Sequence, residues 1–89
     1  NAAIIRYKFK SINCLLFVNA DSKDSRKNLT IKISYDEGKT WTKGKTIYAG
    51  SAAYSDLVVM KNGDIGLLFE KNEYTENVFL SFPFKWISN

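Results

Sequence analysis

The chain of 89 residues contains no histidine, one cysteine and one proline. Without histidine, and with a single cysteine, it cannot build a Ser-His-Asp triad or a Cys/His zinc site from its own residues. A disulfide within the chain is excluded as well, and Cys14, which lies in an apolar run, is expected to pack as a small buried side chain. No apolar run approaches the length of a transmembrane helix, so we expect neither a membrane segment nor a metal site.

The charge of the chain is basic but dispersed. Thirteen Lys and Arg residues against nine Asp and Glu residues give a formal net charge of +4. The lysines are spread along the chain, which favours a solvated basic surface over a patch for nucleic acid, and no aromatic-basic signature of an RNA-binding sheet is present. With 45% hydrophobic and 15% aromatic residues, the composition is that of a globular protein with no nucleic-acid partner.

Hydrophobic alternation predicts an all-β chain without a helix. Residues 14–18 and 65–69 are apolar at consecutive positions, which predicts that the strands of residues 14–18 and 65–70 are buried on both faces. Asn62-Gly63 predicts a hairpin turn, and Pro83 predicts an edge strand or the end of a strand. Four strands are expected before Gly50 and three after it. The seven expected strands span residues 4–10, 14–18, 29–35, 46–49, 54–60, 65–70 and 78–84.

Residues 34–41 read Ser-Tyr-Asp-Glu-Gly-Lys-Thr-Trp and follow an alternating strand. Asp36 can hydrogen-bond its own backbone two residues on, Gly38 can adopt a positive φ, and the Trp41 indole can cover the turn. These properties predict a hairpin turn that is locked by its own side chains. At Ser34, Asp36, Gly38, Thr40 and Trp41 the stretch resembles the Asp-box, which recurs on the outer turns of blades in sialidase-type β-propellers. The resemblance implies a structural role for these five residues and no catalytic one.

Three residues are candidates for chemistry. Arg26 lies in a polar loop, where a guanidinium is usually solvated but can clamp a carboxylate through two parallel hydrogen bonds. Tyr54 follows small residues that would let a ligand approach, although a tyrosine at the end of a strand usually packs with its hydroxyl at water. Glu70 ends an apolar run, where it either marks the exit of the strand into solvent or is held for a partner.

Together these residues resemble the C-terminal part of the catalytic domain of cellular and bacterial sialidases (neuraminidases). The resemblance extends from Ile4 to about Trp86, and the order and spacing of its blocks make it more specific than any single motif. The blocks are residues 15–17, 25–28, 34–41, 53–57 and 68–70.

The resemblance implies a role for each candidate residue. Arg26 is similar to the third arginine of the triad that holds the carboxylate of sialic acid, and Tyr54 to the catalytic nucleophile. Glu70 is similar to the carboxylate that braces another arginine of the triad, one that this chain lacks. The catalytic base and acid of the family, with two of the three arginines, are expected upstream of residue 1.

The implied fold is about two blades of a six-bladed β-propeller within a single segment, residues 1–89. One blade would span residues 3–49 and an incomplete blade residues 53–86. From strand spacing alone, a small β-sandwich competes with this architecture. The implied activity is that of an exo-α-sialidase that removes terminal sialic acid from glycoconjugates with retention and without a cofactor, and the chain alone is expected to be inactive.

A non-catalytic Asp-box module, structural or carbohydrate-binding, is the alternative function. The expected partners are a sialylated glycan and either the remainder of the propeller or further copies of the chain, because apolar sheet faces left in water favour association. The sequence leaves the compartment open, and a secreted or cell-surface location would suit the complete protein.

Overall fold

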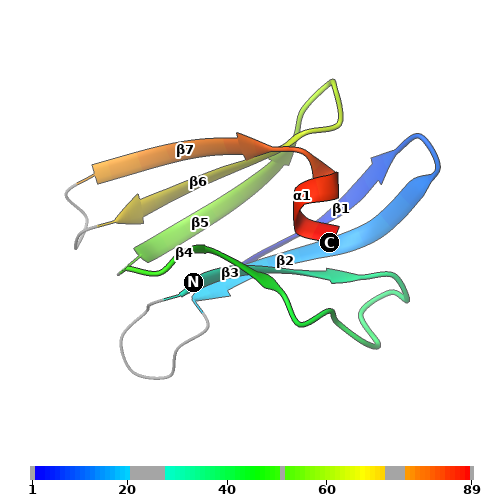
Figure 1. The fold of residues 1–89 in the computed structure, drawn as a ribbon, viewed down its shortest axis with the longest axis horizontal. Helices are drawn as coiled ribbons and strands as arrows, with labels where there is room; N and C mark the ends of the chain where they lie inside the picture. Colours follow the sequence, from blue (N-terminus) through cyan, green and yellow to red (C-terminus); the bar gives the residue numbers. More distant parts are fainter. Residues whose placement is uncertain (1, 21–27, 51, 72–75, 89) are drawn as a thin grey trace.

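The computed structural model describes residues 2–20, 28–50, 52–71 and 76–88, which form two antiparallel sheets and one short helix (Figure 1). The first sheet has four strands in the order β1-β2-β3-β4, and the second has three in the order β5-β6-β7. The predicted all-β chain with four strands followed by three is confirmed. The elements are β1 (Ala2–Phe9), β2 (Ile12–Ala20), β3 (Leu29–Ser34), β4 (Lys45–Tyr48), β5 (Ala52–Val59), β6 (Ile65–Lys71), β7 (Glu76–Phe82) and α1 (Phe84–Ser88).

The hydrophobic core lies between the two sheets, and each sheet contributes one face to it. Alternation along each strand explains the arrangement, because every second residue of a strand points to the same face. Inward residues of the first sheet meet across β1, β2 and β3, as in the pairs Ile5–Leu16 and Leu16–Ile33. The fully enclosed apolar side chains are Tyr7, Cys14, Leu16, Val18, Ile31, Ile33, Ile65, Leu67 and Phe69. The burial expected for Cys14 is thus confirmed, and burial raises the pKa of its thiol.

Within the described residues, the strands of residues 14–18 and 65–70 are buried on one face only, so burial on both faces stays a prediction. Leu68, on the outer face of β6, is 48% exposed, and Leu15 and Phe17, on the outer face of β2, are only half-buried. Within the described parts of the chain no third layer covers either outer face. The apolar runs therefore place hydrophobic side chains toward water as well as toward the core.

The helix α1 was not predicted, and it begins at Phe84, where the sequence pattern placed the end of the last strand. Pro83 ends β7, as predicted, and its fixed φ also suits the start of a helix. Five residues are too few to show a helical period, so only packing reveals the turn. Ile87 is buried, and Lys45 of β4 donates a hydrogen bond of 2.9 Å to the carbonyl oxygen of Trp86. No helix in the described ranges is long and apolar enough to cross a membrane.

Tyr7 connects the first sheet to the second at the end where the hairpin turns lie. It is buried, its hydroxyl donates to the carbonyl oxygen of Gly63, and its ring stacks on Phe84 at 4.8 Å between centroids. Gly63 has a φ of 90° and donates its N–H to Met60 at 2.9 Å. The hairpin turn predicted from Asn62-Gly63 is therefore confirmed.

Candidate functional site

The turn of residues 34–41 is locked by the Asp36 carboxylate. One carboxylate oxygen, Oδ1, accepts hydrogen bonds from the Ser34 hydroxyl and from the Thr40 N–H, both at 2.8 Å. The other, Oδ2, accepts from the Thr40 hydroxyl at 2.5 Å. The sequence suggested a bond from Asp36 to the backbone two residues on, but the Gly38 N–H instead donates to the Ser34 hydroxyl at 2.8 Å. Gly38 has the expected positive φ, 88°.

Trp41 covers this turn, as expected. A Cβ placed on Gly38 would lie 3.9 Å from the indole atom Cζ2, so the ring rests against the glycine. The indole also contacts Phe17 on the outer face of the first sheet, with 5.7 Å between ring centroids. The turn thereby folds back onto its own sheet, and the hydrogen bonds among Ser34, Asp36, Gly38 and Thr40 hold the loop.

An ion pair ties the turn to β1. Arg6 donates from both terminal nitrogens to the two carboxylate oxygens of Glu37, and also at 2.8 Å to the side-chain oxygen of Asn13. The hydrogen bonds from Arg6 lower the pKa of Glu37. Arg6 and Glu37 are 31 residues apart, so no local pattern in the sequence could have paired them.

Replacing Asp36 with asparagine is expected to lower the melting temperature near neutral pH. The melting temperature of the variant should also change less with pH than that of the wild type. Hydrogen bonds from Thr40 and then Ser34 lower the pKa of Asp36 from 3.8 to about 2, which means that the native state favours the ionised carboxylate. This stabilisation is present above the pKa of the unfolded chain and is lost as the pH falls towards the folded value. Thermal melts at pH values from about 6 down to about 2 should show the difference between wild type and variant shrinking. A difference that stays constant over that range would contradict the role of the ionised carboxylate.

Tyr54 lies at an irregularity of the second sheet. In the pairing of β5 with β6, Ala53 lies opposite Glu70 and Ser55 lies opposite Phe69, which leaves Tyr54 as an extra residue without a partner on β6. Such a β-bulge bends the strand and re-aims a side chain, and bulges are over-represented next to active sites. Tyr54 and Glu70 are therefore neighbours across two adjacent strands, although 16 positions separate them in the sequence.

The backbone on either side of Arg26 reaches the same end of the molecule. Ala20 pairs with Leu29, and the N–H of Asn28 donates to the carbonyl oxygen of Ala49, just before β5. The end of β2, the start of β3, the start of β5 and the end of β6 all lie at the left in Figure 1. Arg26 itself falls outside the described residues.

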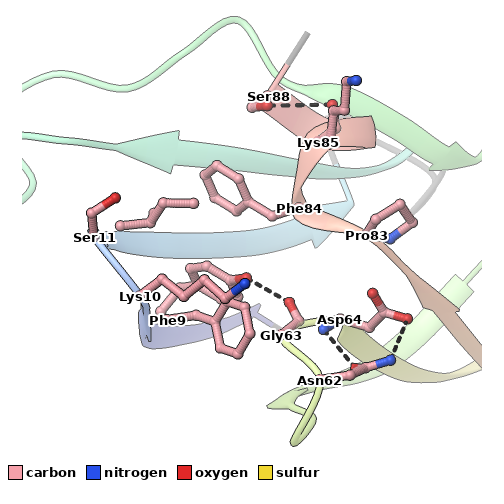
Figure 2. Close-up of a pocket in the computed structure, with 12 residues that line it drawn as sticks. Phe9, Lys10, Ser11, Asn62, Gly63, Asp64, Pro83, Phe84, Lys85 and Ser88 are labelled. Carbon is pink, nitrogen blue, oxygen red and sulfur yellow. Dashed lines mark hydrogen bonds between the residues drawn. The ribbon is translucent and has the colours of Figure 1, made fainter.

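A cavity of about 490 Å³ lies at the opposite end of the molecule, between the two hairpin turns and α1 (Figure 2). Phe9 and Phe84 contribute apolar walls, and Lys10 and Asp64 contribute charge. Lys10 lies over the ring of Phe9, with 5.5 Å from the ammonium nitrogen to the centroid. No chemistry predicted from the sequence falls in this cavity, because Glu70 and the bulge at Tyr54 are at the other end.

The sequence of the chain is similar to those of two curated sialidases. The chain is 40% identical over 73 residues to the sialidase of Micromonospora viridifaciens, and 33% identical over 78 residues to sialidase-2 of Cricetulus griseus. The chain is a homologue of sialidases. The similarity covers 82% and 80% of the chain, and no family model matches it.

The sialidase homologue spans only a small part of these relatives. The matched region amounts to 11% of the sialidase of Micromonospora viridifaciens and 21% of sialidase-2 of Cricetulus griseus. The predicted resemblance to sialidases is confirmed by these alignments.

Proposed function

We propose that the chain is the C-terminal part of a sialidase catalytic domain, and that it contributes Tyr54 as the nucleophile of a retaining exo-α-sialidase. The observation that carries the proposal is the β-bulge, which falls at Tyr54 and beside Glu70 in a chain homologous to sialidases. A β-bulge can redirect a side chain, so a bulge at this position would allow a tyrosine to face a ligand.

The chemistry of the substrate accounts for a phenol at this position. Sialic acid carries its carboxylate on the anomeric carbon, so an aspartate or glutamate nucleophile would approach against like charge, whereas a neutral phenol would not. Tyrosine nucleophiles are a known exception to the two-carboxylate scheme of glycosidases. Because the unperturbed pKa of tyrosine is about 10, a base must accept the phenolic proton as the bond to the anomeric carbon forms.

Glu70 and Arg26 act in this proposal as supports for the substrate carboxylate. Glu70 is half-buried at the end of β6, where its carboxylate would brace an arginine supplied by another segment of the sialidase. Arg26 would hold the substrate carboxylate with two parallel hydrogen bonds. The base, the acid and two further arginines lie outside these 89 residues, so the chain alone would be inactive.

The two sheets would be neighbouring blades of a β-propeller in the sialidase. Each is an antiparallel meander, and they pack face to face through one side only. The exposed apolar side chains on both outer faces support this arrangement, because adjoining blades would cover them. The hydrogen bonds of the 34–41 turn would then secure the outer loop of the first blade.

Replacing Arg26 with lysine in the sialidase is expected to weaken binding of sialic acid by roughly tenfold or more, since lysine keeps the charge but loses the planar fork. Calorimetric titration of wild type and variant with free sialic acid would measure the loss. The methyl ester of sialic acid is the matched control, because it lacks the anionic carboxylate and should bind both proteins equally weakly. Equal affinity of both proteins for free sialic acid would overturn the clamp, and an equal loss for acid and ester would show that Arg26 acts elsewhere.

A further inference from the structure

The turn between β5 and β6 contains Asn62-Gly63, and no other asparagine of the chain is followed by glycine. Asparagine before glycine is especially prone to spontaneous deamidation. The reason is that glycine has no side chain to hinder the approach of its backbone nitrogen to the asparagine side chain. Asn62 is exposed, and Gly63 beside it is buried. The turn therefore combines a reactive sequence with an asparagine that water can reach.

Deamidation forms a bond between the backbone nitrogen of Gly63 and Cγ of Asn62. The backbone nitrogen loses its proton, the bond from Cγ to the side-chain nitrogen breaks, and ammonia leaves. Water then opens the succinimide ring at either carbonyl carbon, which yields aspartate or isoaspartate. In isoaspartate the main chain runs through Cβ and Cγ and is longer by one methylene group. Water is the only co-reactant.

In the folded chain, hydrogen bonds hold both reacting groups. The Gly63 N–H donates to the carbonyl oxygen of Met60 at 2.9 Å. Oδ1 of Asn62 accepts from the Asp64 N–H at 3.0 Å, and its Nδ2 donates to Asp64 Oδ2 at 3.3 Å (Figure 2). The Gly63 nitrogen has to give up its hydrogen bond and its proton before it can attack, and the Asn62 amide has to leave Asp64 to face it. The turn must therefore open before the ring can form.

Two side chains of β1 hold the turn closed. The buried Tyr7 hydroxyl donates to the carbonyl oxygen of Gly63. The ring of Phe9 lies directly against the glycine, since a Cβ placed there would fall 2.5 Å from Phe9 Cε2. Both side chains belong to the first sheet, whereas the turn belongs to the second. The turn is therefore freed only when the sheets separate at this end.

We propose that Asn62 is a site of spontaneous deamidation, and that the contact of Tyr7 and Phe9 with Gly63 controls its rate. The closed contact slows the reaction, and opening of the contact allows it. Either product places a second carboxylate beside Asp64, where like charges repel. Isoaspartate also lengthens the main chain inside the turn. The modification thus makes an opening of the two sheets permanent, and it would proceed whether or not Tyr54 acts as a nucleophile.

Peptide mapping by mass spectrometry tests the site. The complete protein is incubated in water labelled with heavy oxygen, which enters the new carboxylate when the succinimide hydrolyses. We expect label at Asn62, formed at least about tenfold more slowly in the folded protein than in urea, because only the open fraction reacts. Asn62→Gln is the matched control, since glutamine keeps the amide but must form a larger ring. Its peptide should stay unlabelled over the same period.

Tyr7→Phe tests the controlling contact, because it removes the hydroxyl that bonds to Gly63 and keeps the ring. It is expected to speed labelling of the folded protein by about fivefold or more, since the Gly63 carbonyl loses a buried partner. Val18→Ala is the matched control. Val18 is 0% exposed in the same core but lies on β2, opposite Ala3 and away from the turn, so the rate should stay near that of the wild type.

Each other outcome overturns the proposal. Absence of label at Asn62 in urea would show that the site does not react, and equal rates in the folded and unfolded protein would show that the turn gives no protection. Equal acceleration by Tyr7→Phe and Val18→Ala would assign the reaction to unfolding of the whole protein. Unchanged labelling in folded Tyr7→Phe would show that the contact does not control the rate. Phe9→Leu, which removes the ring from Gly63, replaces Tyr7→Phe if circular dichroism shows that variant to be unfolded.

Discussion

If the proposed function is right, replacing Tyr54 with phenylalanine in the complete protein is expected to lower kcat by about a thousandfold or more, roughly the scale seen when a covalent nucleophile is removed. The substitution deletes one oxygen, the atom that would bond to the anomeric carbon, and keeps the ring. The melting temperature should therefore stay nearly unchanged. Steady-state hydrolysis of a fluorogenic sialoside, with a thermal melt of the same preparation, measures both quantities.

Tyr35→Phe is the matched control for this experiment. It removes a phenolic oxygen from another tyrosine, one that is exposed within the 34–41 turn, and should leave turnover unaltered. Near-normal kcat in the Tyr54 variant would show that Tyr54 is not the nucleophile. A joint loss of activity and of melting temperature would assign Tyr54 a structural role instead.

Replacing Leu67 with alanine is expected to destabilise the fold by about 2–5 kcal/mol, the usual cost of truncating an enclosed leucine. Leu67 is 0% exposed, on the face of β6 that packs against the first sheet. A domain of this size has a free energy of unfolding of only about 5–15 kcal/mol, so the variant should melt far below the wild type. Denaturant titration at a concentration where the chain is monomeric measures the difference.

The neighbouring residue provides the control. Leu68→Ala makes the same chemical change one position along β6, on the exposed outer face, and should cost well under 1 kcal/mol. Similar losses for the two variants would contradict the assignment of inner and outer faces. They would indicate that the outer face is covered in solution even at that dilution.

Local patterns explain why most of the fold was predictable. A period of two along each strand and the Asn62-Gly63 turn are properties of neighbouring residues, and the structure places them as expected. The helix at Phe84–Ser88 was missed because it depends on contacts with β3 and β4 that no short pattern encodes. Burial on both faces stays a prediction, because the described residues cover only one face of each sheet and a continuous apolar run does not show what covers the other face.

The same distinction between local and long-range contacts applies to the candidate site. The 34–41 turn could be read from the sequence since Ser34, Asp36 and Thr40 bond to one another within a few residues. The bulge at Tyr54 could not, because it arises from the register between β5 and β6. The contact between Arg6 and Glu37 is likewise long-range. Arg26, Tyr54 and Glu70 were selected by chemistry and resemblance, and their roles stay predictions.

Covalent trapping tests the central claim most directly. A fluorinated sialoside with a good leaving group should form a glycosyl-enzyme that hydrolyses slowly, since fluorine beside the anomeric centre disfavours the positively charged transition state. Proteolysis and mass spectrometry of the complete protein after trapping would then locate the sugar. We predict a single adduct on the peptide that contains Tyr54, bonded through the phenolic oxygen. An adduct on a carboxylate, or on any other residue, would contradict the assignment of Tyr54 as the nucleophile.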